Sequence, residues 1–316
     1  MNTKVSIIVP TYKRSNSLHK TVISILAQTY PNIEIIIVDD NGIENITEQK
    51  NTKKQIEILK EKHNIIKYIS LPNNSGAAIA RNEGIRHASG ELISFLDDDD
   101  TYHPEKIEKQ VNILSKITDP KVAFIKCEMA YIYDNGRYKV TDKSKYFQGN
   151  QFINHIIDQH GIVGTPTFMF KRAALLDVHG FYNTPIRQEY MLILKILAKG
   201  YIGVHHNDIL VDIKTSFDGI SVGKNDKKAA ALANIYNERK KFSELLNKNQ
   251  IYTMETQYLQ DMFRWYSTYN LKEANNVLKK LKLRISKKKY FISFIIMLSK
   301  YYLGNTFYKL KYILRM

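Results

Sequence analysis

Short apolar runs alternate with helical patterns along the first two thirds of the chain. Apolar residues at helical spacing, such as Leu18, Val22 and Ile25, predict helices between the runs, and Pro104 suits the first turn of one helix. Runs of this length between helices indicate βαβ units and a parallel sheet. The expected strands are 5–9, 33–38, 65–71 and 91–96, and the expected helices lie around 18–26, 57–61, 77–88 and 105–114.

The pattern changes beyond residue 121. We expect strands at 122–127, 167–170 and 203–213, a hairpin around Asn135-Gly136, and helices at 151–157 and 188–198. From residue 227 onward there is no strand-like alternation, so we expect helices there. The sequence therefore predicts an α/β domain over residues 1–220 and a helical C-terminal region over residues 221–316.

The composition is that of a globular protein. The 316 residues are 44% hydrophobic and 25% charged, which excludes disordered, collagen-like and disulfide-scaffold proteins. The single cysteine, Cys127, cannot form an internal disulfide, so a reducing cytosolic setting is expected. Pro10 ends the first apolar run, which is too short for a signal peptide or a membrane span.

Positive charge is concentrated at the C-terminal end. The chain has 47 Lys and Arg against 31 Asp and Glu, a net charge of +16; residues 271–316 have 12 basic residues and one acid, so they hold +11 of it. The tail also contains an apolar stretch, 290–298, about half the roughly 20 residues of a membrane span. A basic helix with apolar and aromatic residues predicts an interfacial helix on an anionic membrane surface. The alternative is that the tail packs on the first domain or on a partner subunit.

Polar clusters follow each of the first four predicted strands. They are 11–14, 39–40, 74–76 and 97–100. Ligands of an open parallel sheet bind at the carboxyl ends of its strands, so these clusters would line one crevice. The alternative is that each is an ordinary polar turn.

Four consecutive aspartates, Asp97 to Asp100, form the most distinctive cluster. Such carboxylates repel one another unless cations hold them, and Mg²⁺ or Mn²⁺ takes one or two carboxylates together with substrate phosphates. Helix caps at Asp99 or Asp100, or a calcium site, are alternatives. The two commonest phosphate-binding loops are absent from the sequence, so a bound nucleotide would have its diphosphate held through the metal.

Five segments together resemble the successive motifs of family 2 glycosyltransferases: 5–14, 24–31, 36–40, 74–82 and 90–100. The resemblance covers roughly residues 4–220. It implies a GT-A fold, which is a Rossmann-like nucleotide-binding mixed sheet, here with a basic helical C-terminal extension. It also implies a mostly inverting transfer of a sugar, of the type that builds bacterial surface polysaccharides.

The resemblance also implies roles for single residues. Asp40, or else Asp39, would accept the uracil N3–H, Gly76 would let the backbone approach, and Arg81 would flank the base or the diphosphate. Asp97 or Asp98 would bind the ribose or the donor sugar, and Asp99 would bind Mn²⁺ or Mg²⁺. Pro10, Thr11, Tyr12 and Arg14 would contact the nucleotide.

The general base of the family opens a helix after a Gly-Phe-Asp turn. Here Gly180-Phe-Tyr182 and 187–192 stand in those places, so the resemblance assigns Glu189 as the base that deprotonates the acceptor hydroxyl. Glu replaces the family's usual Asp, and Tyr182 replaces another Asp. The alternative is that Glu189 is an exposed carboxylate favoured by the helix dipole.

The function expected from the sequence is a metal-dependent hexosyltransferase that takes a UDP-sugar as donor. A glycan or lipid-linked molecule would be the acceptor, and the enzyme would be cytoplasmic and peripheral at the inner face of the cell membrane. A catalytically inactive carbohydrate-binding or scaffold subunit is one alternative. A nucleic-acid-binding protein is another, but the predicted crevice is acidic and would repel phosphates, so no nucleic acid partner is expected.

Overall fold

The computed structural model describes residues 3–133, 136, 138–140, 144–158, 164–215, 225–286, 290 and 292–295. It divides into a first unit, Met1–His155 with Gln159–Phe217, and a second unit, Ile156–Asp158 with Asp218–Met316. The predicted domain boundary near residue 220 falls among residues outside the described ranges, and it stays a prediction.

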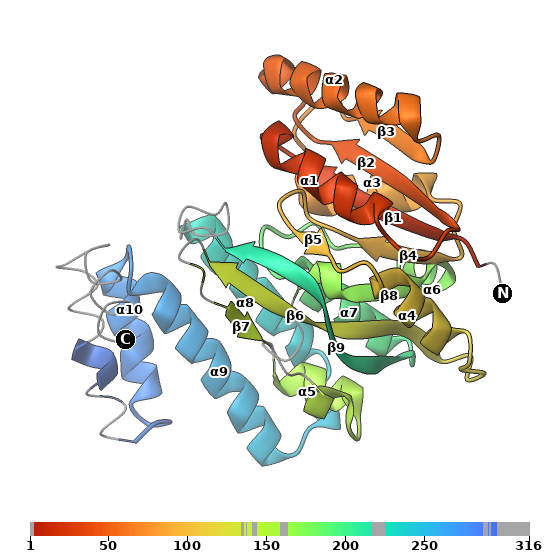
Figure 1. Cartoon of the computed structure of the whole chain (residues 1–316). Coiled ribbons are helices and arrows are strands. Elements are labelled where there is room, and N and C mark those ends of the chain that lie inside the picture. Colours follow the sequence, from red (N-terminus) through yellow and green to blue (C-terminus); the bar gives the residue numbers. More distant parts are fainter. Residues whose placement is uncertain are drawn as a thin grey trace. The chain divides into compact units, whose positions relative to one another are not determined.

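A mixed sheet forms the centre of the first unit (Figure 1), and its strand order is β3-β2-β1-β4-β8-β6-β9-β5, with β7 beside β6. Strands β1 to β4 are parallel, β8 is antiparallel to both of its neighbours, and β9 is parallel to β6. The elements of this unit are β1 (Val5–Thr11), α1 (Ser15–Leu26), β2 (Ile33–Asp39), η1 (Ile43–Asn45), α2 (Ile46–Lys62), β3 (Ile66–Ser70), α3 (Ala77–His87), β4 (Leu92–Phe95), β5 (Thr101–Tyr102), α4 (Lys106–Leu114), β6 (Val122–Tyr133), β7 (Tyr138–Val140), η2 (Ser144–Phe147), α5 (Gln151–Ile157), η3 (Thr165–Thr167), β8 (Phe168–Lys171), α6 (Arg172–Asp177), α7 (Gln188–Ala198) and β9 (Ile202–Thr215).

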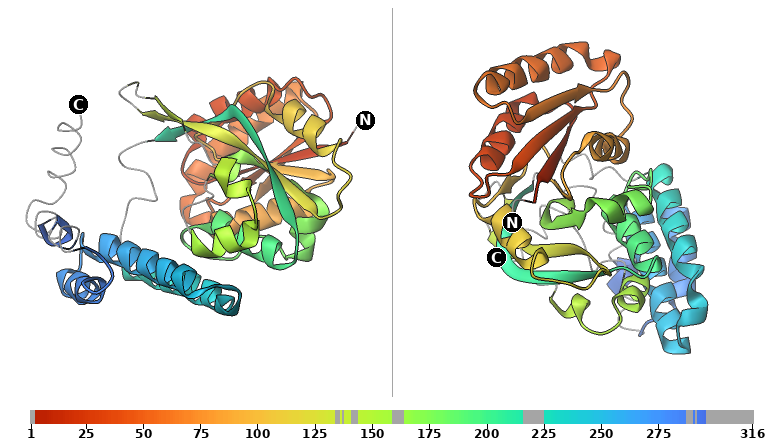
Figure 2. Two further views of the ribbon diagram at one scale, coloured as in Figure 1. Left: turned by 90° about the horizontal axis from the view of Figure 1, so that it is seen from below. Right: turned by 90° about the vertical axis from the view of Figure 1, so that its right-hand side faces the viewer.

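Helices cover both faces of this sheet (Figure 2), which explains why its central strands are apolar at nearly every position. In β1, Val5, Ile7 and Val9 join the core formed with α1, α2 and α4. Ile8, between them, joins the opposite core formed with α3, α6 and α7. Because successive strand residues point to opposite faces, one apolar run serves both cores.

The predicted strands and helices of the first 120 residues are present in the structure with ends shifted by a few residues, although the helix expected at 57–61 is the longer α2. Several elements differ from the sequence prediction, among them helix α6, which was not expected. The strand expected at 122–127 continues to Tyr133 as β6, because β9 pairs with it as far as Tyr133 and β7 pairs with its last part. Strand β5 has only two residues, too few to show any alternation. Residues 134 and 135, where the hairpin turn was expected, lie outside the described residues.

The described part of the second unit is helical, as its lack of alternation predicts, apart from short connections. Its elements are α8 (Asp226–Lys240), η4 (Ser243–Leu245), α9 (Lys248–Tyr266) and α10 (Leu271–Leu281). Asn247 caps α9 in a reciprocal arrangement with Gln250. Helix α10 packs against α9 and buries Leu278 and Leu281. Within the described residues, no helix has the length and apolar character needed to cross a membrane.

Candidate active site

The polar clusters predicted at the strand ends meet at one edge of the sheet. Thr11, the last residue of β1, is paired with Asp39 at the end of β2, and Asp39 is paired with Ser70 at the end of β3. The backbone N–H of Asp40 donates to the carbonyl of Thr11 at 2.9 Å. The aspartates follow β4, the other neighbour of β1. The parallel register therefore brings residues far apart in the sequence to one edge of the sheet, where the sequence predicts the ligand crevice.

Asp98 joins the loop after β4 to the loop after β1. Its carboxylate accepts hydrogen bonds from the Thr11 hydroxyl at 2.7 Å and the Tyr12 backbone N–H at 3.2 Å, and it pairs with Arg14 at 3.1 Å. Burial raises the pKa of Asp98 to about 6, although the bonds from Thr11 and Arg14 oppose the rise. Pro10 lies just before these residues, within β1 and opposite Val38. Asp98 thus fixes the segment predicted to contact the nucleotide.

The four aspartates alternate between open and buried positions. The side chains of Asp97 and Asp99 are 35% and 23% exposed, whereas Asp98 and Asp100 are buried. Asp99 lies 2.5 Å from a guanidinium nitrogen of Arg14. Burial raises the pKa of Asp99, and the charge of Arg14 opposes this rise. Of the residues predicted to bind the donor or the metal here, Asp97 and Asp99 are the ones that stay partly exposed.

Asp39 is fully buried and its carboxylate accepts three hydrogen bonds from its neighbours. It accepts from the backbone and side-chain amides of Asn41 at 2.9 and 2.8 Å and from the Tyr68 hydroxyl at 2.7 Å. Burial raises the pKa of Asp39. The Asn41 side chain in turn accepts from the backbone N–H of Lys13, which has a left-handed φ of 55°. Asn41 therefore shapes the loop after β1, a role that the sequence analysis missed; its position directly after the two aspartates is the only local signal of it.

Asp40 holds the turn that leads into α3. One of its oxygens accepts the backbone N–H of Ser75 and the other accepts that of Gly76, both at 2.7 Å. Gly76 has a φ of 89°, which a residue with a side chain adopts only with strain. Burial raises the pKa of Asp40. The structure thus joins two predicted nucleotide-binding positions, Asp40 and Gly76, through one carboxylate.

Arg81 bridges the aspartate loop and the start of α7. Its guanidinium donates to Asp97 at 2.5 Å and to the side-chain oxygen of Gln188 at 2.6 Å, and it lies 5.5 Å from the ring centroid of Phe181. Gln188 is the first residue of α7, directly before Glu189. The bridge places the predicted base beside the aspartates although about 90 residues separate them in the chain.

Glu189 lies half-buried in the first turn of α7. Burial raises the pKa of its carboxyl, the nearby Arg81 opposes the rise, and Asp97 adds to it. Among the described residues, no other side chain donates a hydrogen bond to Glu189. A carboxylate of raised pKa with open oxygens has the properties of a general base.

The described residues include no group of three His, Cys, Asp or Glu side chains placed to hold a metal by themselves. Asp99 nevertheless offers an oxygen that Arg14 does not contact, and the open carboxylate of Asp97 belongs to the same loop. A hard cation in a nucleotide site takes one or two protein carboxylates and obtains its other ligands from phosphates and water. These residues therefore fit a metal site that a bound diphosphate completes.

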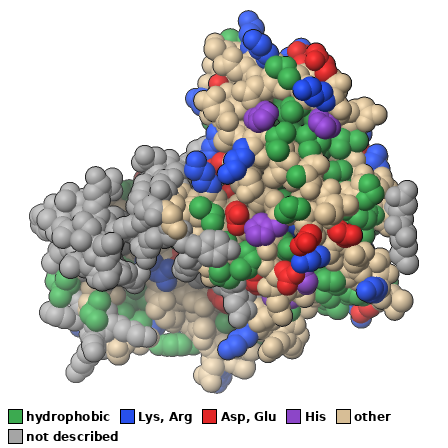
Figure 3. Space-filling model, in the orientation of Figure 1, with side chains coloured by type: hydrophobic (Ala, Val, Ile, Leu, Met, Phe, Trp, Pro, Cys, Tyr) green, Lys and Arg blue, Asp and Glu red, His purple; other side chains and the backbone are tan. Residues whose placement is uncertain are grey.

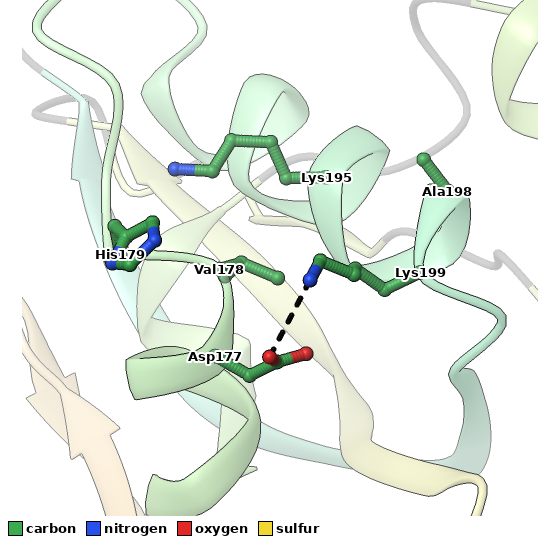
Figure 4. A pocket seen from close by; sticks show the side chains of 6 residues that line it. All are labelled: Asp177, Val178, His179, Lys195, Ala198 and Lys199. Carbon is green, nitrogen blue, oxygen red and sulfur yellow. Dashed lines mark hydrogen bonds and ion pairs between the residues drawn. The ribbon is translucent and has the colours of Figure 1, made fainter.

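A pocket of about 350 Å³ lies elsewhere on the first unit, beside α6 and α7 (Figure 4). Its two lysines are engaged within the protein: Lys195 donates to the carbonyl of Gly180 at 2.5 Å, and Lys199 lies 3.5 Å from Asp177. None of the predicted site residues lines it. The lining residues are Asp177, Val178, His179, Lys195, Ala198 and Lys199.

Comparison with known proteins identifies the family. The family model described as Glycosyl transferase family 2 matches residues 6–179. The chain belongs to glycosyl transferase family 2. The sequence of this family 2 chain is 28% identical over 221 residues to TuaG of Bacillus subtilis, a glycosyltransferase named for teichuronic acid biosynthesis; the match covers 70% of this chain and 82% of TuaG. The family predicted from the motifs is thereby confirmed.

Solved structures confirm the GT-A fold. S. aureus TarS 1–349 in complex with UDP-GlcNAc has a TM-score of 0.64 at 17% identity, and the match covers 94% of this chain and 88% of the TarS 1–349 chain. The mannosyltransferase PcManGT of Pyrobaculum calidifontis, in complex with GDP-Man and Mn²⁺, has a TM-score of 0.61 at 18% identity, covering 96% of this family 2 chain and 83% of PcManGT. Against other family relatives the match is partial: the chain spans 23% of the length of two rickettsial glycosyltransferases and 58% of one from Haemophilus influenzae.

Proposed function

We propose that the protein is a metal-dependent, inverting glycosyltransferase that moves a sugar from a UDP-sugar to a glycan or lipid-linked acceptor. The observation that carries this proposal is the Arg81 bridge, which brings the open carboxylates of Asp97 and Asp99 to the same crevice as Glu189. Family membership, the naming of TuaG and the UDP-GlcNAc bound to TarS support synthesis of a bacterial surface polysaccharide as the pathway.

In this proposal the nucleotide lies along the loops after β1, β2 and β3, against Pro10, Thr11, Tyr12 and Arg14. Asp40 is the better candidate for the uracil N3–H, because Asp39 has no exposed surface and already accepts three hydrogen bonds. A carboxylate has about four acceptor positions, so Asp40 can accept from the base and still hold Ser75 and Gly76.

In the proposed reaction, the acceptor hydroxyl oxygen attacks the anomeric carbon of the donor sugar from the face opposite the diphosphate. The bond between that carbon and the phosphate oxygen breaks, and its electron pair leaves with UDP. Glu189 takes the hydroxyl proton, and Arg81 keeps α7 beside the aspartate loop while this happens. A divalent metal held by Asp99 and the diphosphate would stabilise the charge that develops on the leaving group.

A panel of nucleotide sugars tests the proposed function. We expect UDP release from one or a few UDP-sugars in the presence of Mn²⁺, and no turnover of GDP-mannose, as measured by a coupled assay for free nucleoside diphosphate. UDP with Mn²⁺ should also raise the melting temperature. If no UDP-sugar is turned over although UDP binds, the protein is the inactive carbohydrate-binding subunit.

Binding of nucleic acid without UDP binding would favour the other alternative. The face of the first unit visible in Figure 3 counts against it, since basic, acidic and histidine side chains are interspersed there. Phosphate backbones bind to surfaces on which Lys and Arg predominate.

We also propose that the C-terminal end binds an anionic membrane surface. The described residues after α10 include exposed apolar residues: Leu283 is 89% exposed, and Ile292 and Ile295 are 45% and 48% exposed. Residues 287–316 hold seven Lys and Arg and no acid, and residues 296–316 lie outside the described ranges. Each basic residue near an anionic surface contributes on the order of 1 kcal/mol to binding.

Truncation after Ser286 should abolish binding to anionic vesicles at low salt and leave donor hydrolysis unchanged. This cut keeps α10, whose Leu278 and Leu281 are buried against α9, so the second unit stays folded. Co-sedimentation with phosphatidylglycerol vesicles measures the effect, and neutral vesicles and high salt are the controls. If the full chain shows no salt-sensitive binding, the C-terminal end has another role.

A further inference from the structure

A buried lysine without a counter-ion lies behind the aspartate loop. Lys106, in the first turn of α4, is fully buried. Its ammonium donates to the Ser94 hydroxyl at 2.8 Å and to the Gln110 side-chain oxygen at 2.7 Å, and it lies 4.2 Å from the ring centroid of Tyr102. Among the described residues no carboxylate lies within ion-pair distance of Lys106. A buried charge is normally paired with a charge of opposite sign, so Lys106 differs from most buried lysines.

The partners of Lys106 hold both ends of the aspartate loop. The Tyr102 hydroxyl donates to the carbonyl of Phe95 at 2.5 Å and lies 3.3 Å from the Ser94 hydroxyl. Phe95 is the last residue of β4 and Tyr102 is the last of β5, so this contact closes the segment 96–101, which carries all four aspartates. Burial raises the pKa of Tyr102, so the phenol stays protonated and donates.

The same network is anchored to β8, the neighbour of β4, and to the residue before it. The Ser94 hydroxyl donates to the carbonyl of Phe168 in β8 at 2.7 Å, and the Gln110 side-chain amide donates to the carbonyl of Thr167 at 2.9 Å. The titratable groups that face Lys106 are Tyr102 from β5 and Cys127 from β6, and burial raises the pKa of both, so both are neutral. Burial lowers the pKa of Lys106 to about 8, so the ammonium is still the main form at neutral pH.

We infer that Lys106 and Tyr102 are positioning residues that hold the aspartate loop in the geometry needed to bind a metal–diphosphate. Asp97 and Asp99 reach the crevice only if the loop that carries them keeps its shape, and the mutual repulsion of four carboxylates opposes this. Groups behind a metal ligand that orient it affect metal affinity by about 10–100-fold when they are removed. The inference rests on the proposed nucleotide-sugar transfer and adds to it the residues that prepare the site.

The test compares Tyr102→Phe with Tyr30→Phe. Tyr30 is also buried, and its hydroxyl donates to the backbone carbonyl of Thr3 at 2.7 Å. It lies before the start of β2, whereas the predicted site residues follow the end of that strand. Each variant removes the hydrogen bond from a tyrosine hydroxyl to a backbone carbonyl, so the two should lose similar stability. Calorimetry of UDP binding with and without Mn²⁺ gives the gain in UDP affinity due to metal. We expect Tyr102→Phe to reduce this gain about tenfold and Tyr30→Phe to leave it within about twofold of wild type.

Lys106→Met should act in the same direction as Tyr102→Phe, and if it does not fold, the tyrosine pair alone decides the question. Equal metal-dependent affinity in Tyr102→Phe and Tyr30→Phe would overturn the inference. Failure of the wild-type protein to bind UDP more tightly with Mn²⁺ would instead contradict the proposed function, so the two failures are distinct.

Discussion

Glu189→Gln should lower kcat for sugar transfer by about 10²–10⁴-fold, because it removes the group that takes the acceptor proton. Donor affinity should change little, since Arg81 reaches Asp97 and Gln188 and not the Glu189 side chain. Steady-state kinetics gives kcat, and calorimetry with UDP gives the affinity for the nucleotide part of the donor. The acid limb of the pH–rate profile is a second measurement. Burial raises the Glu189 pKa above its ordinary value, so kcat should fall as the pH drops through that raised value and protonates the base.

Glu108→Gln is the matched control for this experiment. Glu108 is also a glutamate in the first turn of a helix, α4, and it accepts a hydrogen bond from Thr29 at 2.6 Å on the surface. Like Glu189→Gln, this substitution removes a carboxylate that the helix dipole stabilises, but Glu108 is not one of the predicted site residues. A loss of less than threefold in Glu189→Gln, or an equal loss in the control, would show that another carboxylate is the base.

Asp99→Asn should abolish metal-dependent turnover and leave the protein folded. A metal at a leaving diphosphate contributes several kcal/mol to the transition state, so we expect a rate loss of at least about 10²-fold. Arg14 loses one partner but keeps its ion pair with Asp98 at 3.1 Å. The aspartate loop also loses one of four carboxylates that repel one another, so the melting temperature should stay close to that of the wild type. Turnover measured across a Mn²⁺ titration is the readout.

Asp208→Asn controls for the loss of an ion pair alone. Asp208 lies 2.8 Å from Lys109 and 3.2 Å from His206 on the surface of the first unit, and it is not one of the predicted site residues. Its replacement should leave activity within about twofold of wild type, since exposed ion pairs contribute little to stability. Wild-type turnover by Asp99→Asn at limiting Mn²⁺ would remove Asp99 from the metal site.

The local pattern of the sequence was sufficient to predict most of the secondary-structure elements and the family. Strands β1 and β2 are apolar on both faces, so the sequence alone indicated a covered parallel sheet, and helices α1, α3 and α7 follow from spacing. The order of five motifs along the chain predicted family 2 and the GT-A fold, both now confirmed. The position of polar residues directly after strands was enough to predict that they meet, because parallel strands end at the same edge.

The tertiary structure alone decided which of these polar groups are partly exposed and which are buried. No local pattern separates Asp97 and Asp99 from Asp98, since all three follow β4 in an unbroken run; Thr11, 87 residues earlier, takes Asp98 into the interior. In the same way, Arg81 donates to Gln188, which is 107 residues away in the chain. Lys106 is a buried cation because Ser94 of β4 and Tyr102 of β5 pack against it. The sequence determined the elements because periodicity is local, whereas the contacts that set burial and charge in the crevice join residues that only the packed sheet brings together.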